Sequence, residues 1–298
     1  MGAMRVAVVD VGSNTARLLV ADVEGNELEP VREEKAYLGL AAEIMRDGCI
    51  SSSALSRTSD AVTRYARLAR RDGVERLETF VTAPGRQAAS SQALVARLED
   101  ATRRPVGVLS AEDEGRLAFA GALARAGEVS GVVAVCDVGG GSTEIAVGTR
   151  LLGPAWVRSA DIGSLRLTHG WLAGDPPGAE AVARARDAAR EALRPLVPPR
   201  PDVAFAVGGS ARAAAKLVGR ELGRSDLDDT VDIAHRRSAA KLARIFGLDI
   251  QRAHTLLAGT IILGEVVRLL GVEFKVARGG LREGAALALA GSDRAAAA

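Results

Sequence analysis

Two segments of the sequence contain the residue types that bind phosphate and metal ions. The first, DVGSNTARLLV, starts at Asp10, and the second, DVGGGSTEIAV, starts at Asp137. They align without a gap at an offset of 127 residues. Each consists of a strand-like run, an aspartate, a glycine-rich turn and a second strand-like run, so each predicts a β-hairpin. A repeat one domain apart predicts duplicated halves that face each other, and the alternative is a chance likeness of two hairpins.

The predicted hairpins pair 5–11 with 17–23 and 132–138 with 143–147. Glycine-rich turns let backbone N–H groups approach an anion closely. Carboxylates such as Asp10 and Asp137 at strand ends suit Mg²⁺, which prefers one or two carboxylates with water and substrate phosphate. Two such turns facing across a cleft would hold a phosphate chain from both sides. Neither turn is a Walker loop, because no Gly-Lys-Ser/Thr follows it.

A third glycine-rich turn, Gly208-Gly209-Ser210, follows the predicted strand 203–207 and precedes a predicted helix over 211–218. Free N–H groups and the helix dipole favour phosphate at such a helix N-terminus. A tight turn without a ligand is the alternative interpretation.

An acidic run, Glu112-Asp113-Glu114, lies in the first turn of a helix predicted over 110–126. Ser110 with Asp113 three residues later forms a capping-box pattern. Acids in a first turn complement the helix dipole, which accounts for Glu112 and Asp113. Glu114 is then available to orient or deprotonate a water molecule.

Composition limits the function classes. A length of 298 residues predicts about two domains, and alternating strands and helices indicate α/β architecture. Balanced charge (39 Lys+Arg, 37 Asp+Glu) and 3% aromatic residues argue against a nucleic-acid partner. Two cysteines are too few for structural zinc, and a reducing cytoplasmic compartment fits them. We expect no membrane partner, because Glu265 and Arg268 interrupt the longest apolar stretch, 256–270.

Further segments are TAPGR (82–86), SAEDEGRLAFAGAL (110–123), DIGSLRLTH (161–169), AVGGSARAAAKL (206–217) and GGLREG (279–284). Together with the repeat, they resemble the exopolyphosphatase and guanosine pentaphosphate phosphatase (Ppx/GppA) family. The resemblance implies an α/β fold of two duplicated ribonuclease-H-like domains, of the actin, Hsp70 and sugar-kinase superfamily, with an active site in the interdomain cleft. We expect a first domain over 1–124 plus a C-terminal helix at 283–290, and a second over 125–282.

The resemblance also implies roles for individual residues. Glu114 matches the base that activates water, and Asp10, Asp137 and Glu144 match carboxylates around Mg²⁺ or Mn²⁺. Arg17 is implied to contact phosphate, although a cross-domain ion pair with Glu144 is an equal alternative. The residues implied to bind phosphate are Ser13, Asn14, Arg17, Arg86, Gly139, Gly140, Gly141, Ser142, Thr143, Gly208, Gly209 and Ser210.

The activity implied is release of the terminal phosphate of inorganic polyphosphate. Alternatives are hydrolysis of guanosine pentaphosphate (pppGpp), an actin-like-fold kinase, and a non-catalytic regulator that binds a nucleotide or alarmone. A homodimer is compatible with the sequence. Pro84, Ser90 and His254 depart from the family pattern, and these departures bear on substrate preference more than on catalysis.

Overall fold

The computed structural model describes residues 2–296, and the side chains as far as residue 291. The chain divides into two compact units. Unit 1 comprises Met1–Arg125 and Gly279–Ala298, and unit 2 comprises Ala126–Arg278. The sequence analysis placed the boundaries after residues 124 and 282.

The sheet of unit 1 has five strands in the order β3-β2-β1-β4-β5. Strand β1 pairs antiparallel with β2 and parallel with β4, so the predicted hairpin lies at the centre of the sheet. The strands are β1 (Met4–Val11), β2 (Thr15–Glu24), β3 (Glu27–Tyr37), β4 (Arg76–Val81) and β5 (Gly107–Val108).

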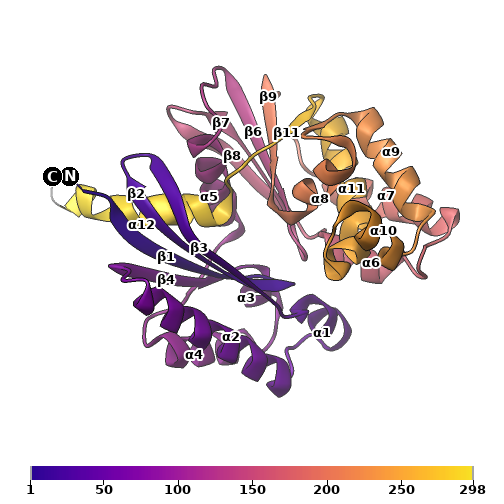
Figure 1. Cartoon of the computed structure of the whole chain (residues 1–298). Coiled ribbons are helices and arrows are strands. Elements are labelled where there is room, and N and C mark those ends of the chain that lie inside the picture. Colours follow the sequence, from indigo (N-terminus) through magenta and orange to yellow (C-terminus); the bar gives the residue numbers. More distant parts are fainter. Residues whose placement is uncertain (1, 297–298) are drawn as a thin grey trace. The chain divides into compact units, whose positions relative to one another are not determined.

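Helices cover both faces of this sheet (Figure 1). Helices α2 and α4 pack against Ala7, Val9 and Val11, and α12 packs against Val6 and Val8. Alternate residues of β1 therefore belong to two different cores, as a strand buried on both faces requires. The helices are α1 (Leu40–Asp47), α2 (Ser52–Arg71), α3 (Ala83–Gln87), α4 (Ser91–Thr102), α5 (Ala111–Ala124) and α12 (Leu281–Ala296).

The sheet of unit 2 has six strands in the order β10-β11-β9-β6-β7-β8. Its central strand β6 pairs antiparallel with β7 and parallel with β9, as β1 does with β2 and β4. The strands are β6 (Val132–Val138), β7 (Thr143–Thr149), β8 (Gly153–Ala160), β9 (Val203–Val207), β10 (Glu221–Leu222) and β11 (Phe274–Val276).

One large core joins this sheet to helices. Ala134, Cys136 and Val138 of β6 pack in it with residues of all the helices of unit 2. These helices are α6 (Ser164–Trp171), α7 (Ala179–Leu193), α8 (Gly208–Val218), α9 (Arg224–His235), α10 (Ala239–Phe246) and α11 (Ile250–Leu270).

Helix α11 is long and apolar enough to cross a membrane, and 78% of that apolar stretch is buried inside the protein. Glu265 and Arg268 interrupt the apolar run in the sequence, but α11 continues through both residues without a break. Glu265 is only 4% exposed, and Arg190 Nε of α7 lies 3.2 Å from its carboxylate. The hydropathy of α11 is accounted for by its place in the core.

The two units share register as well as strand order. Asp10 lies opposite Arg17 and beside Phe80, whereas Asp137 lies opposite Glu144 and beside Val207. The 127-residue offset of the hairpins thus extends to β4 and β9. The predicted duplication is confirmed in strand order, direction and register.

The sequence pattern does not reveal strands β3 and β8. Both lie at a sheet edge, where one row of backbone groups has no strand partner. Along β3 only Leu28 is buried, and charged side chains occupy much of the strand. The alternation of apolar and polar residues that reveals a half-buried strand is therefore weak there.

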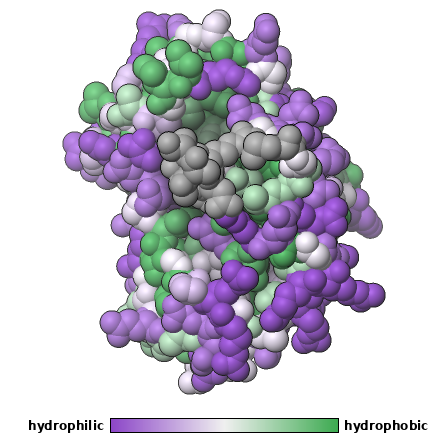
Figure 2. Space-filling model, turned by 90° about the vertical axis from the view of Figure 1, so that its left-hand side faces the viewer, coloured by the Kyte–Doolittle hydropathy of each residue, from purple (hydrophilic) through white to green (hydrophobic). Residues whose placement is uncertain are grey.

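The face of the molecule shown in Figure 2 is mostly hydrophilic, with hydrophobic residues in separate patches. Among the described residues, the most exposed large hydrophobic side chains are Leu151 (91%) and Leu152 (86%), at the connection between β7 and β8. Isolated exposed apolar residues are common on protein surfaces and carry no functional assignment.

Candidate functional site

The two predicted turns have the same backbone hydrogen bond. Gly12 N donates to Thr15 O at 3.0 Å, and Gly139 N donates to Ser142 O at 3.0 Å. These donors and acceptors are related by the 127-residue offset. The repeat therefore encodes one turn geometry, used once in each unit.

The charges beside the two turns differ. In unit 1 the residue across from Asp10 is Arg17, and in unit 2 the residue across from Asp137 is Glu144. Cross-strand partners point to the same face of a sheet. Unit 1 therefore presents an acid and a base side by side, and unit 2 presents two acids.

The acid pair of unit 2 is partly withdrawn from solvent. Glu144 is 1% exposed and accepts a hydrogen bond from Ser159 Oγ at 2.9 Å. Burial, together with the carboxylates of Asp137 and Glu144, raises the pKa of the Cys136 thiol well above its usual value. The same negative field favours a cation beside the pair.

The two carboxylates of this acid pair suit a magnesium ion whose remaining coordination positions are filled by water and substrate phosphate. The described residues contain no group of three or more His, Cys, Asp or Glu that could hold a metal ion alone. Mg²⁺ usually takes one or two carboxylates and fills its other positions with water and phosphate oxygens. Asp137 and Glu144 match that donor set, and Asp10 lies in unit 1.

The glycine-rich turn of unit 2 rests on the first turn of α6. Gly139 O accepts from Ser164 N at 2.8 Å, and Gly140 O accepts from Leu165 N at 3.0 Å. Within the described part of the chain, Gly140 N and Gly141 N donate to no backbone carbonyl. These two predicted phosphate-binding residues have amides suited to an anion.

Three other predicted phosphate-binding residues of unit 2 are buried. Ser142 supplies the carbonyl of the turn's own hydrogen bond. Thr143 Oγ1 donates to Ile162 O at 2.5 Å, and Ser210 Oγ donates to Val138 O at 2.9 Å. The hydroxyls of Thr143 and Ser210 are thus directed to protein carbonyls, and the phosphate role of these residues stays a prediction.

The turn 208–210 forms the start of α8, which therefore begins three residues before the helix predicted over 211–218. Gly208 has φ +80°, and a Cβ there would collide with the Asp137 carboxylate. Glycine is required at this position for both reasons. A Cβ at Gly209 would collide with the guanidinium of Arg252 from α11, so a cationic group lies over the N-terminus of α8.

In the turn of unit 1, the carbonyls of Ser13 and Asn14 also accept hydrogen bonds from backbone amides outside the turn. Ser13 O accepts from Ala41 N at 3.0 Å, and Asn14 O accepts from Leu38 N at 2.8 Å. Thr82 N donates to Val11 O at 3.1 Å, and Thr82 directly precedes α3, the helix that contains Arg86. The start of α1 therefore supports this turn as α6 supports the turn of unit 2.

The acidic run behaves as its spacing predicts. Ser110 Oγ accepts from Asp113 N at 3.0 Å and caps α5, and Glu112 pairs with Arg116 one turn later at 2.7 Å. Glu114 is different: it is 8% exposed, and its Oε2 lies 2.9 Å from Arg86 Nη1. The helix dipole thus accounts for Glu112 and Asp113, and Glu114 lies in a partly buried ion pair.

Arg86 joins α3 to this carboxylate. Its Nη1 also donates to Leu109 O at 2.7 Å. An adjacent guanidinium favours the charged, proton-accepting form of a carboxylate. Arg86, predicted to contact phosphate, therefore directly contacts the predicted base.

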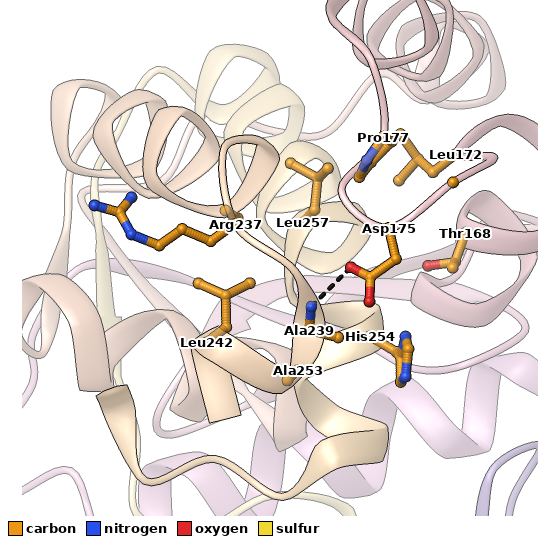
Figure 3. Close-up of a pocket in the computed structure, with 12 residues that line it drawn as sticks. Thr168, Leu172, Asp175, Pro177, Arg237, Ala239, Leu242, Ala253, His254 and Leu257 are labelled. Carbon is orange, nitrogen blue, oxygen red and sulfur yellow. Dashed lines mark hydrogen bonds between the residues drawn. The ribbon is translucent and has the colours of Figure 1, made fainter. Parts of the chain in front are cut away.

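A pocket in unit 2 lies away from the turn, between α6, α10 and α11 (Figure 3). It holds about 390 Å³ of empty space, open solvent included. Asp175 accepts from Ala239 N at 2.7 Å, and Arg237 points away from Asp175 and His254. None of the predicted site residues lines this pocket. His254, which departs from the expected pattern, belongs to this pocket.

Comparison with known proteins agrees with the repeat and the acidic helix. A family model described as the Ppx/GppA phosphatase family matches residues 19–292. The chain belongs to the Ppx/GppA phosphatase family. The matched range includes the acidic helix, the turn 139–142 and the N-terminus of α8.

Ppx/GppA relatives and structures cover nearly the whole chain. An uncharacterized protein of Streptomyces coelicolor is 35% identical over 91% of this chain and 85% of its own. Exopolyphosphatase 1 of Mycobacterium tuberculosis is 31% identical over 94% of this chain and 87% of its own. The crystal structure of the Aquifex aeolicus Ppx/GppA family member has a TM-score of 0.83 at 25% identity, covering 98% of this chain and 99% of its own. The actin-like, ribonuclease-H-like fold expected from the sequence is confirmed.

Sequence reasoning missed two residues beside the turns. Arg252 lies against Gly209 although 43 residues separate them in sequence. Ser164 is 25 residues from the carbonyl that it contacts. No local motif announces such pairs, and only the packing of α6 and α11 onto the sheet brings them together.

Proposed function

We propose that this Ppx/GppA phosphatase is an exopolyphosphatase that removes the terminal phosphate of inorganic polyphosphate. The observation that carries the proposal is the ion pair of buried Glu114 with partly buried Arg86, which sets one carboxylate of the acidic run apart from the two that stabilise the helix. The 31% identity to a named exopolyphosphatase favours polyphosphate as the substrate.

In the proposed reaction, Glu114 accepts a proton from water as the water oxygen attacks the terminal phosphorus. The bond from that phosphorus to the bridging oxygen breaks, releasing orthophosphate and a chain shorter by one unit. Arg86 orients Glu114 through the 2.9 Å contact. The buried position of Glu114 limits competing contacts with bulk solvent.

In unit 2, the amides of Gly140 and Gly141 would bind phosphate oxygens. Asp137 and Glu144 would hold Mg²⁺ or Mn²⁺, which neutralises phosphate charge when bound. Gly208 keeps the space beside the Asp137 carboxylate free of a side chain.

Glu114→Gln tests the proposal, because glutamine keeps the shape of the side chain and cannot accept the proton. We expect phosphate release from inorganic polyphosphate to fall about 10³-fold, within the range for loss of a general base. Glu112→Gln is the matched control, because Glu112 is exposed and pairs with Arg116 on the same helix.

Substrate identity is measured in the same assay with short polyphosphate, long polyphosphate and pppGpp, each with and without Mg²⁺. Faster turnover of pppGpp than of either polyphosphate would contradict the proposed substrate. Turnover of Glu114→Gln near that of the control would contradict the assignment of the base.

A further inference from the structure

We propose that two buried serines, Ser164 and Ser210, are positioning residues that fix the direction of the amides in the turn 139–142. The inference rests on the proposed phosphate-binding role of that turn. It assigns the two hydroxyls to the protein and not to the substrate.

Three consecutive carbonyls at the start of the turn, those of Val138, Gly139 and Gly140, are held by donors from outside it. Val138 O accepts from Ser210 Oγ at 2.9 Å. Gly139 O accepts from Ser164 N at 2.8 Å and from Ser164 Oγ at 3.1 Å. Gly140 O accepts from two amides of α6, Leu165 N at 3.0 Å and Arg166 N at 3.1 Å.

Holding these carbonyls determines where the next amides point. A trans peptide unit is planar, so its C=O and the following N–H point in opposite directions. The carbonyl of Gly139, held by Ser164, directs Gly140 N–H away from α6. The carbonyl of Gly140 does the same for Gly141 N–H. Two successive amides directed outward form a concave site for an anion.

Neither serine serves its own helix. Helix α6 begins after Gly163 and α8 begins after Val207, and neither has a side-chain cap hydrogen bond. Ser164 and Ser210 are each 2% exposed, which leaves their hydroxyls no access to a ligand in solution. Their hydrogen bonds to the turn are therefore the function that remains for these hydroxyls.

Close packing keeps both serines in place. A Cβ at Gly163 would collide with the Gly140 carbonyl, so α6 approaches the turn at backbone contact. A Cβ at Gly259 would lie 2.9 Å from Ser210 Oγ, so α11 closes over Ser210. Removing the Ser210 hydroxyl leaves Val138 O without its hydroxyl donor, which loosens the peptide whose Gly139 N–H closes the turn on Ser142 O. Removing the Ser164 hydroxyl leaves Gly139 O with Ser164 N as its remaining donor.

The experiment measures binding of inorganic tripolyphosphate to the full chain carrying Glu114→Gln, so that turnover does not consume the probe. Ser210→Ala should weaken binding about tenfold, because Val138 O loses its hydroxyl donor. Ser164→Ala should weaken binding about threefold, because Ser164 N still holds Gly139 O. Ser164→Thr keeps a hydroxyl and should retain the affinity of the parent.

Thr230→Val is the control: its hydroxyl is buried in unit 2 and donates to Asp226 O within α9, away from the turn. A second readout, independent of any variant, is the NMR signal of each amide. Tripolyphosphate should move the Gly140 and Gly141 signals strongly in the parent, and less in Ser210→Ala.

Equal affinity in Ser164→Ala, Ser210→Ala and Thr230→Val would overturn the inference and leave the proposed hydrolysis intact. Unmoved Gly140 and Gly141 signals on saturation with tripolyphosphate would also overturn it, even if Ser210→Ala failed to fold. Bound tripolyphosphate with both amide shifts, but no phosphate release by the wild-type chain, would support the positioning role and contradict the proposed function.

Discussion

The β1–β2 hairpin of unit 1 and the β6–β7 hairpin of unit 2 share a backbone and differ in chemistry. Both have the same strand register and the same hydrogen bond across the turn. Unit 1 pairs Asp10 with Arg17, whereas unit 2 pairs Asp137 with Glu144. One duplicated scaffold therefore presents a cationic side chain at a position where its copy presents an anionic one.

The supports of the two turns differ as well. Backbone amides hold Val11 O, Ser13 O and Asn14 O in unit 1. In unit 2 serine hydroxyls take part, on Val138 O and Gly139 O. The comparison indicates that the direction of the turn's peptides is set by neighbouring elements, and that each unit achieves it with different residues.

Of the substitutions that compare the two hairpins, Glu144→Gln should have the largest effect on the rate of phosphate release. Glutamine keeps an oxygen for Ser159 Oγ and removes the second negative charge of the acid pair. We expect phosphate release to fall about 100-fold and the Mg²⁺ concentration for half-maximal rate to rise. Ser159→Ala keeps the carboxylate and should change the rate about twofold or less. If the rate of Glu144→Gln depended on Mg²⁺ as the wild-type rate does, the assignment of a metal site to Asp137 and Glu144 would be contradicted.

Arg17→Ala alters the same register position in unit 1. We expect the KM for tripolyphosphate to rise about tenfold, equivalent to about 1.4 kcal/mol, with unchanged dependence on Mg²⁺. Arg17→Lys should recover part of the loss, since lysine keeps the charge without the planar guanidinium. A shift in Mg²⁺ dependence like that of Glu144→Gln would show that the two positions do not have separate roles.

Gly208→Ala tests the close approach of α8 to Asp137, for which Val81 is the counterpart in unit 1. The new Cβ meets a carboxylate oxygen at a positive φ, so we expect a loss of about 2–3 kcal/mol in unfolding free energy and reduced activity. Gly219→Ala at the other end of α8 has positive φ and open space. It should lose about 1 kcal/mol and leave activity unchanged. Equal effects of the two variants, measured by urea unfolding, would exclude a specific role for the Asp137 contact.

Glu78→Gln should have the smallest effect. Its counterpart in unit 2 is the buried Phe205, and burial raises the pKa of Glu78 above its usual value. A raised pKa in the folded state means that this residue's contribution to stability is present at acid pH and lost as pH rises through that pKa. We therefore expect the free energy of unfolding of the variant to exceed that of the wild type by about 0.5 kcal/mol near pH 8, and to equal it near pH 4. Urea unfolding at both pH values measures this, and a gain at pH 4 alone would contradict it.

Local patterns in the sequence predicted the features that depend on neighbours along the chain. The two hairpins, the Ser110 cap and the separation of Glu114 from Glu112 and Asp113 all follow from spacing within a strand or a helix turn. The family resemblance added the actin-like fold, which the strand orders and the Aquifex structure confirm.

Side-chain direction was the part that sequence reasoning could not supply. The family resemblance implied a phosphate role for Thr143 and Ser210, and in the structure their hydroxyls donate to Ile162 O and Val138 O. Those acceptors come from other elements, 19 and 72 residues away. The catalytic role of Glu114 and the metal role of Asp137 and Glu144 stay predictions.

The return of the chain to unit 1 after Arg278 has a consequence for the order of folding during synthesis. Leu281, Ala285 and Ala286 of α12 complete the core cluster that contains Val6 and Val8, near the opposite end of the chain. All of the residues of unit 2 leave the ribosome before this helix does. Unit 2 can therefore bury its core while unit 1 still lacks one layer, and one face of the first sheet stays without its covering helix until α12 has been made.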